Sequence, residues 1–194
     1  QKQIIFDLKK ITLKNKSFSN LNFQKLPNIM GVLNLTPDSF SDGGKFNKTN
    51  KGIKHAFEMI SAGANLIDVG GESTRPGSKT VNPKNEWNRI YRILRLVCKK
   101  VPVSLDTRKS EIMEKGIKLG VKIINDVSGL NYDKKTLDIL KKYQTPFVIQ
   151  HSKGTPENMK IKPTYKNELL EIYDFFEKKI KTLRSIGIKH SDII

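Results

Sequence analysis

The sequence predicts an α/β protein: a (βα)8 TIM barrel represented by about five βα units and the start of strand six, preceded by a β-hairpin. Three observations lead to this fold. Apolar runs alternate strictly with helical patterns, and each short return to a parallel strand requires a crossover. The runs are continuously apolar, as in sheets covered on both faces. Each run also ends in a polar residue, which favours a barrel over a doubly wound sheet because all barrel strands end at one mouth.

The first elements follow from local patterns. Residues 3–18 alternate enough to form a β-hairpin. An apolar run over residues 28–36 predicts the first barrel strand, and residues 49–64 predict the helix after it. In that helix three apolar residues fall on one face, and Gly63 can supply a left-handed stop.

Four further units repeat this order. The expected strands are residues 65–72, 101–107, 121–129 and 145–152, and the expected helices are residues 85–100, 110–120, 134–143 and 167–187. Residues 191–194 resemble the beginning of a sixth strand. The helix over residues 85–100 carries an apolar stripe made of Trp87, Ile90, Tyr91, Leu94 and Val97.

Composition places the chain among soluble globular proteins. With 194 residues and 37% apolar content it can bury a substantial core, so residues 1–194 are expected to belong to one domain. No apolar run approaches the roughly 18 residues that a membrane helix needs. The single cysteine, Cys98, gives no disulfide framework and no Cys/His metal cluster, which fits a reducing compartment. We therefore expect a cytoplasmic protein without a membrane partner.

The net charge of +17 could indicate a nucleic-acid binder, but its distribution argues against that class. Lysine is spread along the whole chain, much of it on expected helix faces, and aromatic and basic residues do not alternate. We expect no nucleic-acid partner. The same charge would favour small anionic substrates.

Five polar residues end the successive apolar runs: Asn34, Asp68, Asp106, Asn125 and His151. Polar groups that project from buried strands cost a few kcal/mol when unpaired, so Asp106 and Asn125 need either protein partners or a ligand. For Asp68 a structural and a functional role remain equally open. His151 has no Cys or further His nearby, so we expect it to form a hydrogen bond at the mouth rather than bind a metal.

Two polar loops follow the first two strands. The first lies within "GVLNLTPDSFSDGG", residues 31–44, and the second is "GGESTRPGS", residues 70–78. The glycines let the backbone approach a ligand, and Ser73, Thr74 and Arg75 supply donors for a phosphate or carboxylate. The second loop has neither the spacing of a P-loop nor the position of a Rossmann fingerprint.

These two segments closely resemble the signatures of the dihydropteroate synthase family. The resemblance continues through "VSLDTRKSEIMEKGIKLGVKIINDVSG" and, more loosely, "FVIQHSKGTPENM", so it covers the chain from about residue 28. The family belongs to the transferases of folate biosynthesis and is the target of sulfonamides. It joins 6-hydroxymethyl-7,8-dihydropterin diphosphate to p-aminobenzoate and releases diphosphate. Its fold is a (βα)8 barrel, and its members are often homodimers.

The resemblance implies a role for each matching position. Asn34 matches the Asn that helps to hold Mg²⁺ and diphosphate, and an amide oxygen suits an ion that keeps most of its waters. Asp106 and Asn125 match pterin-binding positions. Thr74 and Arg75 match positions near the diphosphate and p-aminobenzoate, and Arg75 joins Asn34 among the implied catalytic residues.

Three further positions match the family, and Gln150 departs from it. Pro76 corresponds to the rim of the aminobenzoate site, and Phe40 and Asp42 match residues that close over the site. Asp42 is the implied catalytic carboxylate, because positive charge develops on the pterin methylene as its bond to diphosphate loosens. Gln150 stands where many members carry a Met against the pterin.

The chain ends at Ile194, where the family continues into an Asp-Pro-Gly segment and later substrate-binding residues. We therefore interpret residues 1–194 as a pterin-binding barrel domain that is incomplete at its C-terminus. Two alternatives stay open: a pterin-binding methyltransferase-like barrel, and a non-catalytic truncated paralogue.

Five units and a strand stub cannot close an eight-stranded barrel, so we expect the 194 residues alone to have little or no synthase activity. An assay of diphosphate release with both substrates tests this expectation. Turnover that approaches that of the full-length protein would contradict it.

Overall fold

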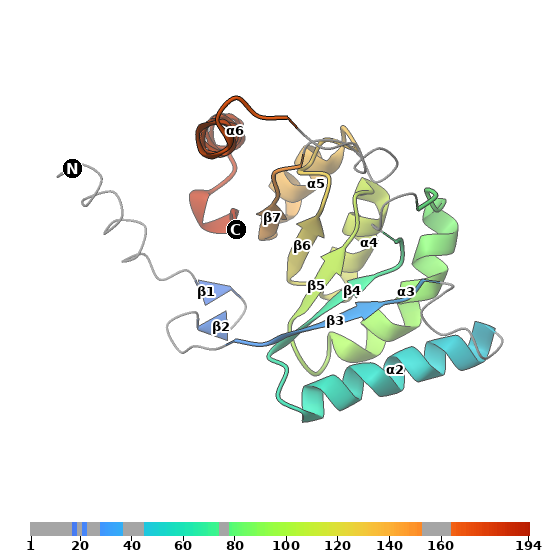
Figure 1. Ribbon diagram of the computed structural model, residues 1–194. Helices are drawn as coiled ribbons and strands as arrows, with labels where there is room; N and C mark the ends of the chain where they lie inside the picture. Colours follow the sequence, from blue (N-terminus) through green and yellow to red (C-terminus); the bar gives the residue numbers. More distant parts are fainter. Residues whose placement is uncertain (1–16, 19–20, 23–27, 37–44, 74–77, 153–163) are drawn as a thin grey trace.

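The structure is a computed structural model that describes residues 17–18, 21–22, 28–36, 45–73, 78–152 and 164–194. Five parallel strands form one sheet in the order β3-β4-β5-β6-β7, and a helix follows each strand (Figure 1). The strands are β3 (Met30–Asn34), β4 (Leu66–Gly70), β5 (Val103–Asp106), β6 (Ile123–Asp126) and β7 (Phe147–Ile149). The helices are α2 (Lys45–Ser61), α3 (Pro83–Val97), α4 (Ser110–Leu119), α5 (Thr136–Tyr143) and α6 (Glu168–Ser185). All five predicted βα units are confirmed.

Local capping explains several helix ends. At the start of α3 the Asn82 side chain accepts a hydrogen bond from the Asn85 amide at 2.8 Å, and a proline occupies the first turn. At the start of α6 the Asn167 side chain accepts from the Leu170 amide at 3.2 Å. After α2 the chain takes a left-handed turn at Gly63, where φ is 104°, so the predicted stop is confirmed. Helix α2 begins four residues earlier than the pattern predicted.

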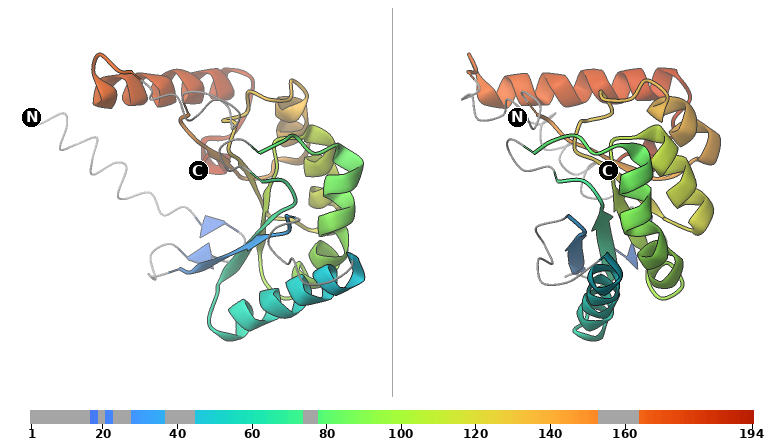
Figure 2. Two further views of the ribbon diagram at one scale, coloured as in Figure 1. Left: turned by 45° about the vertical axis from the view of Figure 1, so that its right-hand side comes forward. Right: turned by 90° about the vertical axis from the view of Figure 1, so that its right-hand side faces the viewer.

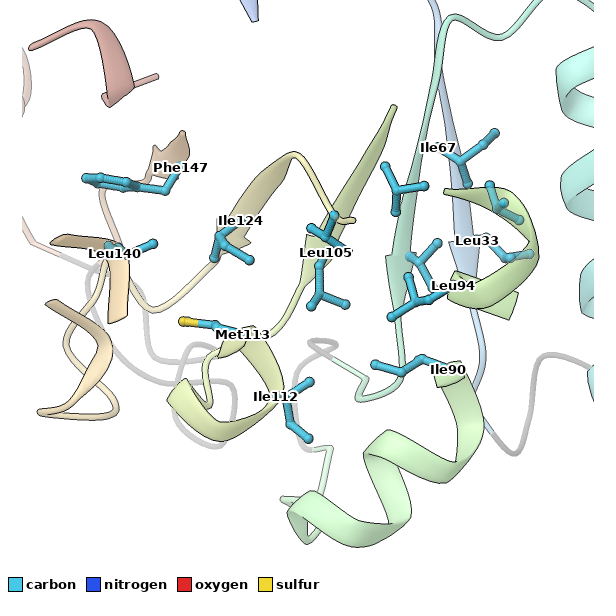
Figure 3. Packing of buried hydrophobic residues seen from close by; sticks show 14 of the residues in the cluster. Leu33, Ile67, Ile90, Leu94, Leu105, Ile112, Met113, Ile124, Leu140 and Phe147 are labelled. Carbon is cyan, nitrogen blue, oxygen red and sulfur yellow. The ribbon is translucent and has the colours of Figure 1, made fainter. Parts of the chain in front are cut away.

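The main hydrophobic core lies between one face of the sheet and the helices (Figure 3). Figure 2 shows α2, α3 and α4 along one side of the sheet, with α6 at the opposite end of the molecule from α2. Alternate strand residues point into this core, as the two-residue period of a strand requires. The strand and helix residues that meet there include Leu33, Ile67, Val69, Leu105, Ile124, Ile90, Leu94, Ile112 and Met113.

The buried stripe of α3 is rotated from the predicted one. Ile90, Leu94 and Val97 are fully buried as expected. Trp87 and Tyr91 are only half-buried, and their rings pack on each other with centroids 5.5 Å apart. Glu86 and Ile93 occupy the buried positions instead. The prediction failed there because it excluded a charged residue from the core face.

The opposite face of the sheet carries a smaller apolar group at the N-terminal ends of the strands. Leu66 and Ile123 are buried there, with Val148 packed against them. On β3 the exposed fractions of Met30 and Val32 are 47% and 51%. At the C-terminal ends of β3, β5 and β6 the same face carries polar side chains, whereas on β7 the apolar Val148 pairs with Asn125.

The last residues of the chain extend the sheet. Ile193 pairs with Phe147 in parallel, and the Ile194 amide donates to the Phe147 carbonyl at 2.9 Å. The Ile149 amide in turn donates to the Ile194 carbonyl at 3.0 Å. The predicted sixth strand is confirmed for these two residues, whereas His190–Asp192 form the 3-10 turn η2.

At the other end of the chain β1 (Ser17–Phe18) and β2 (Leu21–Asn22) form an antiparallel pair. A hairpin is therefore present, but it lies at the end of the segment predicted for it and beyond, and residues 3–16 lie outside the described residues. None of the described helices has the length and apolar character needed to cross a membrane.

Gly116 on α4 gives a test of this packing. A Cβ atom at Gly116 would overlap Leu105 Cδ2 in the core, so we expect Gly116→Ala to destabilise the protein. Overpacking costs about 1–3 kcal/mol, and the better helix propensity of Ala returns up to about 1 kcal/mol. We therefore expect a net loss of about 1–2 kcal/mol in urea unfolding. Lys118→Ala, at an exposed position of the same helix, should change stability by less than about 0.5 kcal/mol. A more stable Gly116→Ala protein would contradict the described packing.

Candidate active site

The candidate site lies on the face of the sheet that turns away from the main core, at the C-terminal ends of the strands. The pairing register aligns Asn34, Gly70, Asp106 and Asn125 in one row across β3, β4, β5 and β6. Paired residues of neighbouring strands share a face, so the three side chains in this row emerge on the same side. The structure therefore brings together three of the residues that the sequence predicted to bind substrate or metal.

Gly70 sits at the centre of this row and leaves room for its neighbours. A Cβ atom built on Gly70 would lie 3.3 Å from Asn34 Oδ1 and 3.3 Å from Asp106 Oδ2. These two oxygen atoms thus converge over a bare backbone, and a side chain at position 70 would crowd both of them.

Asp68 lies one layer deeper on the same face, where it pairs in register with Val32 and Ser104. Its side chain is 5% exposed, and Asn125 Nδ2 donates to Asp68 Oδ2 over 3.3 Å. Burial raises the pKa of Asp68, while hydrogen bonds from Ser104 and Asn125 act in the opposite direction. Asp68 is therefore a buried carboxylate that is hydrogen-bonded directly to Asn125, a residue of the row.

Asp106 has the most altered titration of the site. Burial, together with repulsion from the carboxylates of Asp68, Asp126, Glu86 and Glu72, raises the pKa of Asp106 to about 7. A donor group from a ligand would stabilise the ionised form of this carboxyl.

Two acceptor atoms of the site are buried without a donor. Among the described residues, neither Asp68 Oδ1 nor Asn125 Oδ1 has a hydrogen-bond partner. Buried acceptors that lack a partner cost free energy, so this arrangement suits a ligand rich in N–H donors.

A buried ion network surrounds the turn that follows Asp106. Lys109 Nζ donates to Glu72 Oε2 at 2.9 Å and to Glu86 Oε2 at 2.5 Å, and Glu86 Oε1 accepts from the Thr107 hydroxyl at 2.5 Å. The side chains of Lys109, Glu72 and Glu86 are at most 6% exposed. Such a network holds its members firmly, because breaking one buried pair leaves an uncompensated charge. It fixes the end of β5 against α3.

Glu72 also connects the two ends of the second polar loop. Its Oε1 accepts from the Val81 amide at 2.7 Å, and its Oε2 accepts from Arg108 Nε at 3.1 Å. Burial acts to raise the pKa of Glu72, but the hydrogen bonds from Lys109, Val81 and Arg108 outweigh burial and lower it. The Ser78 hydroxyl donates to the Ser73 carbonyl at 2.6 Å and so also joins the two ends of this loop.

Five predicted site residues lie outside the described residues: Phe40, Asp42, Thr74, Arg75 and Pro76. Of the remaining predicted residues, Gln150 is exposed directly after β7, and no hydrogen bond among the described residues joins its side chain to the row.

His151, which we expected to form a hydrogen bond at the mouth, packs its ring edge-on against Phe175 of α6. Their ring centroids are 4.9 Å apart. The ring of Tyr165 lies 6.0 Å from the same His151 ring. This position of His151 makes it a contact between the end of β7 and α6.

For a metal ion the described residues offer no group of three or more His, Cys, Asp or Glu side chains. The amide oxygen of Asn34 is a hard ligand, however, and it lies over Gly70 beside the Asp106 carboxylate. This donor set fits Mg²⁺, which binds through one or two protein ligands together with substrate phosphates and water.

Sequence reasoning missed the ion network and the partner of Asp68. A usable signal existed for Glu86, since an acid four residues before Ile90 stands on the apolar face of a helix. The contact between Asp68 and Asn125 joins residues 57 positions apart, and only the strand register reveals it.

Comparison with known proteins gives one consistent result. The family described as pterin binding enzyme matches residues 30–194. The dihydropteroate synthase of Clostridium beijerinckii is 40% identical over 168 residues, which cover 86% of this chain and 60% of that protein. The chain thus spans about three-fifths of the length of this relative.

Two solved structures show the same likeness. A dihydropteroate synthase from Clostridium difficile, determined in the presence of pteroic acid, superposes with a TM-score of 0.80 at 39% identity, over 89% of this chain and 64% of that chain. The Xanthomonas albilineans enzyme with 4-aminobenzoic acid gives a TM-score of 0.82 at 30% identity, over 93% of this chain and 65% of that chain. These similarities identify the sheet as part of a barrel wall.

The raised pKa of Asp106 predicts a pH-dependent stability in the absence of ligand. Because the folded pKa is about 7 and the ordinary value is 3.8, the stability contribution is fully present below pH 3.8 and is lost as the pH rises through 7. Asp106→Asn should remove this loss. Between pH 5 and pH 8 the wild type should lose roughly 1–3 kcal/mol more than the variant in urea unfolding. Glu58→Gln, at an exposed position of α2, should keep the wild-type pH dependence, and equal slopes for wild type and Asp106→Asn would disprove the shift.

Proposed function

The chain belongs to the pterin-binding enzyme family, and we propose that the complete protein is a dihydropteroate synthase of folate biosynthesis. This transferase would join 6-hydroxymethyl-7,8-dihydropterin diphosphate to p-aminobenzoate and release diphosphate. The observation that carries the proposal is the row of Asn34, Asp106 and Asn125 over Gly70, set beside buried acceptors that lack donors. The names of the relatives favour a synthase over a pterin-binding methyltransferase.

The pterin ring supplies the donors that the site lacks. Its pyrimidine edge carries an amino group and a ring N–H, which Asp106 and Asn125 can accept in a partly dry pocket. Charge-assisted hydrogen bonds of this kind are about twice as strong as neutral ones. Binding would also stabilise the ionised form of Asp106, whose pKa of about 7 leaves it partly protonated in the free protein.

The diphosphate lies nearer to Asn34 in this proposal. Asn34 Oδ1 would hold a Mg²⁺ ion together with the substrate phosphates, and Thr74 and Arg75 would bind the same anion. When bound, the metal would neutralise the charge that builds up on the leaving group. Asp42 would stabilise the positive charge on the pterin methylene, while Phe40 and Pro76 border p-aminobenzoate.

Two wider features belong to the same proposal. A cytoplasmic location is supported by the single cysteine and the small-molecule substrates. A homodimer is supported by three large apolar residues of α6 that stand exposed in the structure, namely Leu169, Leu170 and Tyr173.

Turnover by the complete protein tests the proposal. Release of diphosphate should require the pterin diphosphate, p-aminobenzoate and Mg²⁺ together. Asp106→Ala removes charged hydrogen bonds and should lower kcat/KM by roughly 10- to 150-fold. Asn34→Ala should mainly raise the Mg²⁺ concentration needed for half-maximal activity, by roughly tenfold.

Thr136→Val serves as the control for both variants, because Thr136 is buried at the start of α5 and its hydroxyl has no hydrogen-bond partner among the described residues. Its activity should stay within about threefold of the wild type. A wild-type protein that binds a pterin but releases no diphosphate under these conditions would refute the synthase assignment.

A further inference from the structure

Asp68 occupies a position that the proposed chemistry does not use. It lies one layer beneath the row of Asn34, Gly70 and Asp106, on the same face of the sheet. Its side chain is 5% exposed, yet no Lys or Arg among the described residues forms an ion pair with it. A buried carboxylate without a cation is costly, so its hydrogen bonds decide whether it is tolerated.

The contact with Asn125 has a defined direction. An ionised carboxylate can only accept hydrogen bonds, whereas an amide has one donating and one accepting side. The donor side of Asn125 therefore faces Asp68, with Nδ2 and Oδ2 3.3 Å apart. This leaves Asn125 Oδ1 as the free end of the amide, and that atom is buried without a donor among the described residues.

The surrounding groups help to keep Asp68 in this role. Ser104, its neighbour on β5, forms a second side-chain hydrogen bond with Asp68. Asn125 is anchored by its strand, in register between Asp106 and Val148. The Asn125 amide can thus rotate about its side-chain bonds, but rotation by half a turn would point its oxygen at the Asp68 carboxylate and repel it.

We infer that Asp68 is a positioning residue, which fixes the amide of Asn125 so that its oxygen faces the ligand. The site thereby selects a ligand that presents an N–H donor at Asn125 and discriminates against one that presents an acceptor there. This inference rests on the proposed function, because it takes a pterin as the ligand. Asp68 acts in this role through its Oδ2, which accepts from Asn125, whereas its Oδ1 is the second buried acceptor without a donor among the described residues.

An exchange of the two side chains tests this assignment in the complete protein, with 6-hydroxymethylpterin as the probe and calorimetry as the measurement. Asn125→Asp alone sets two carboxylates against each other and should weaken binding by about 100-fold. Asp68→Asn alone permits either amide direction and should weaken binding by about 3- to 10-fold. The double variant Asp68→Asn/Asn125→Asp restores one donor and one acceptor with the direction reversed, because the amide now lies below and donates to the carboxylate above. Its affinity should therefore return to within about tenfold of the wild type.

Each result has a separate meaning. If the double variant binds no better than Asn125→Asp, or if Asp68→Asn alone loses as much as Asn125→Asp, then Asp68 does not act by orienting the amide and the inference is wrong. If the wild type binds no pterin, the proposed function fails before the exchange is tested. Glu58→Gln, at an exposed position of α2, serves as the control and should stay within about threefold of the wild type.

A second measurement uses only the wild-type protein and therefore tests the inference even if the variants do not fold. In the wild-type protein without ligand, the side-chain NH₂ group of Asn125 should show one hydrogen exchanging slowly, because that hydrogen is bonded to a buried carboxylate. Addition of the pterin should leave this hydrogen protected, since the ligand binds the oxygen side. Rapid exchange of both hydrogens in the free protein would overturn the inference.

Discussion

The site depends on the register of four parallel strands. Strand side chains alternate between two faces, so Asn34, Asp106 and Asn125 share a face only while each strand pairs as it does. A slip of one residue in β5 would bring Leu105 into the polar row and turn Asp106 toward the helices. Leu105 is fully buried against α4, and its packing prevents that slip. The core therefore sets the geometry of the polar face without contributing an atom to it.

Charge is distributed differently on either side of β5. Behind the strand end, Glu72 and Glu86 share the cation of Lys109, and Arg108 completes a network of two acids and two bases. On the polar face, neither Asp68 nor Asp106 forms an ion pair with a Lys or Arg among the described residues, and the pKa values of both carboxyls are raised. Ionised carboxylates whose charge is balanced by Lys109 and Arg108 suit a scaffold. Carboxylates that lack donors suit a place where a ligand supplies them.

Local pattern accounts for much of this architecture. The period of the apolar runs and the glycine after α2 were sufficient to predict five βα units and the residues at the strand ends. The pattern-based prediction failed where a residue lies in an environment unusual for its type. Glu86 lies in the core because Lys109, 23 positions away, neutralises its charge. It also left the role of Asp68 open, because its partner Asn125 is adjacent only after the sheet has formed. Such pairings depend on tertiary structure, and no local property of either residue encodes them.

β3 forms one edge of the described five-stranded sheet, and Asn34 stands at its end. An edge strand offers unpaired backbone groups, so any segment that pairs with β3 will set the twist and height of this strand. The geometry of the row is therefore coupled to the pairing of β3. A strand that closes the barrel beside β3 would also fix how far Asn34 stands from Asp106.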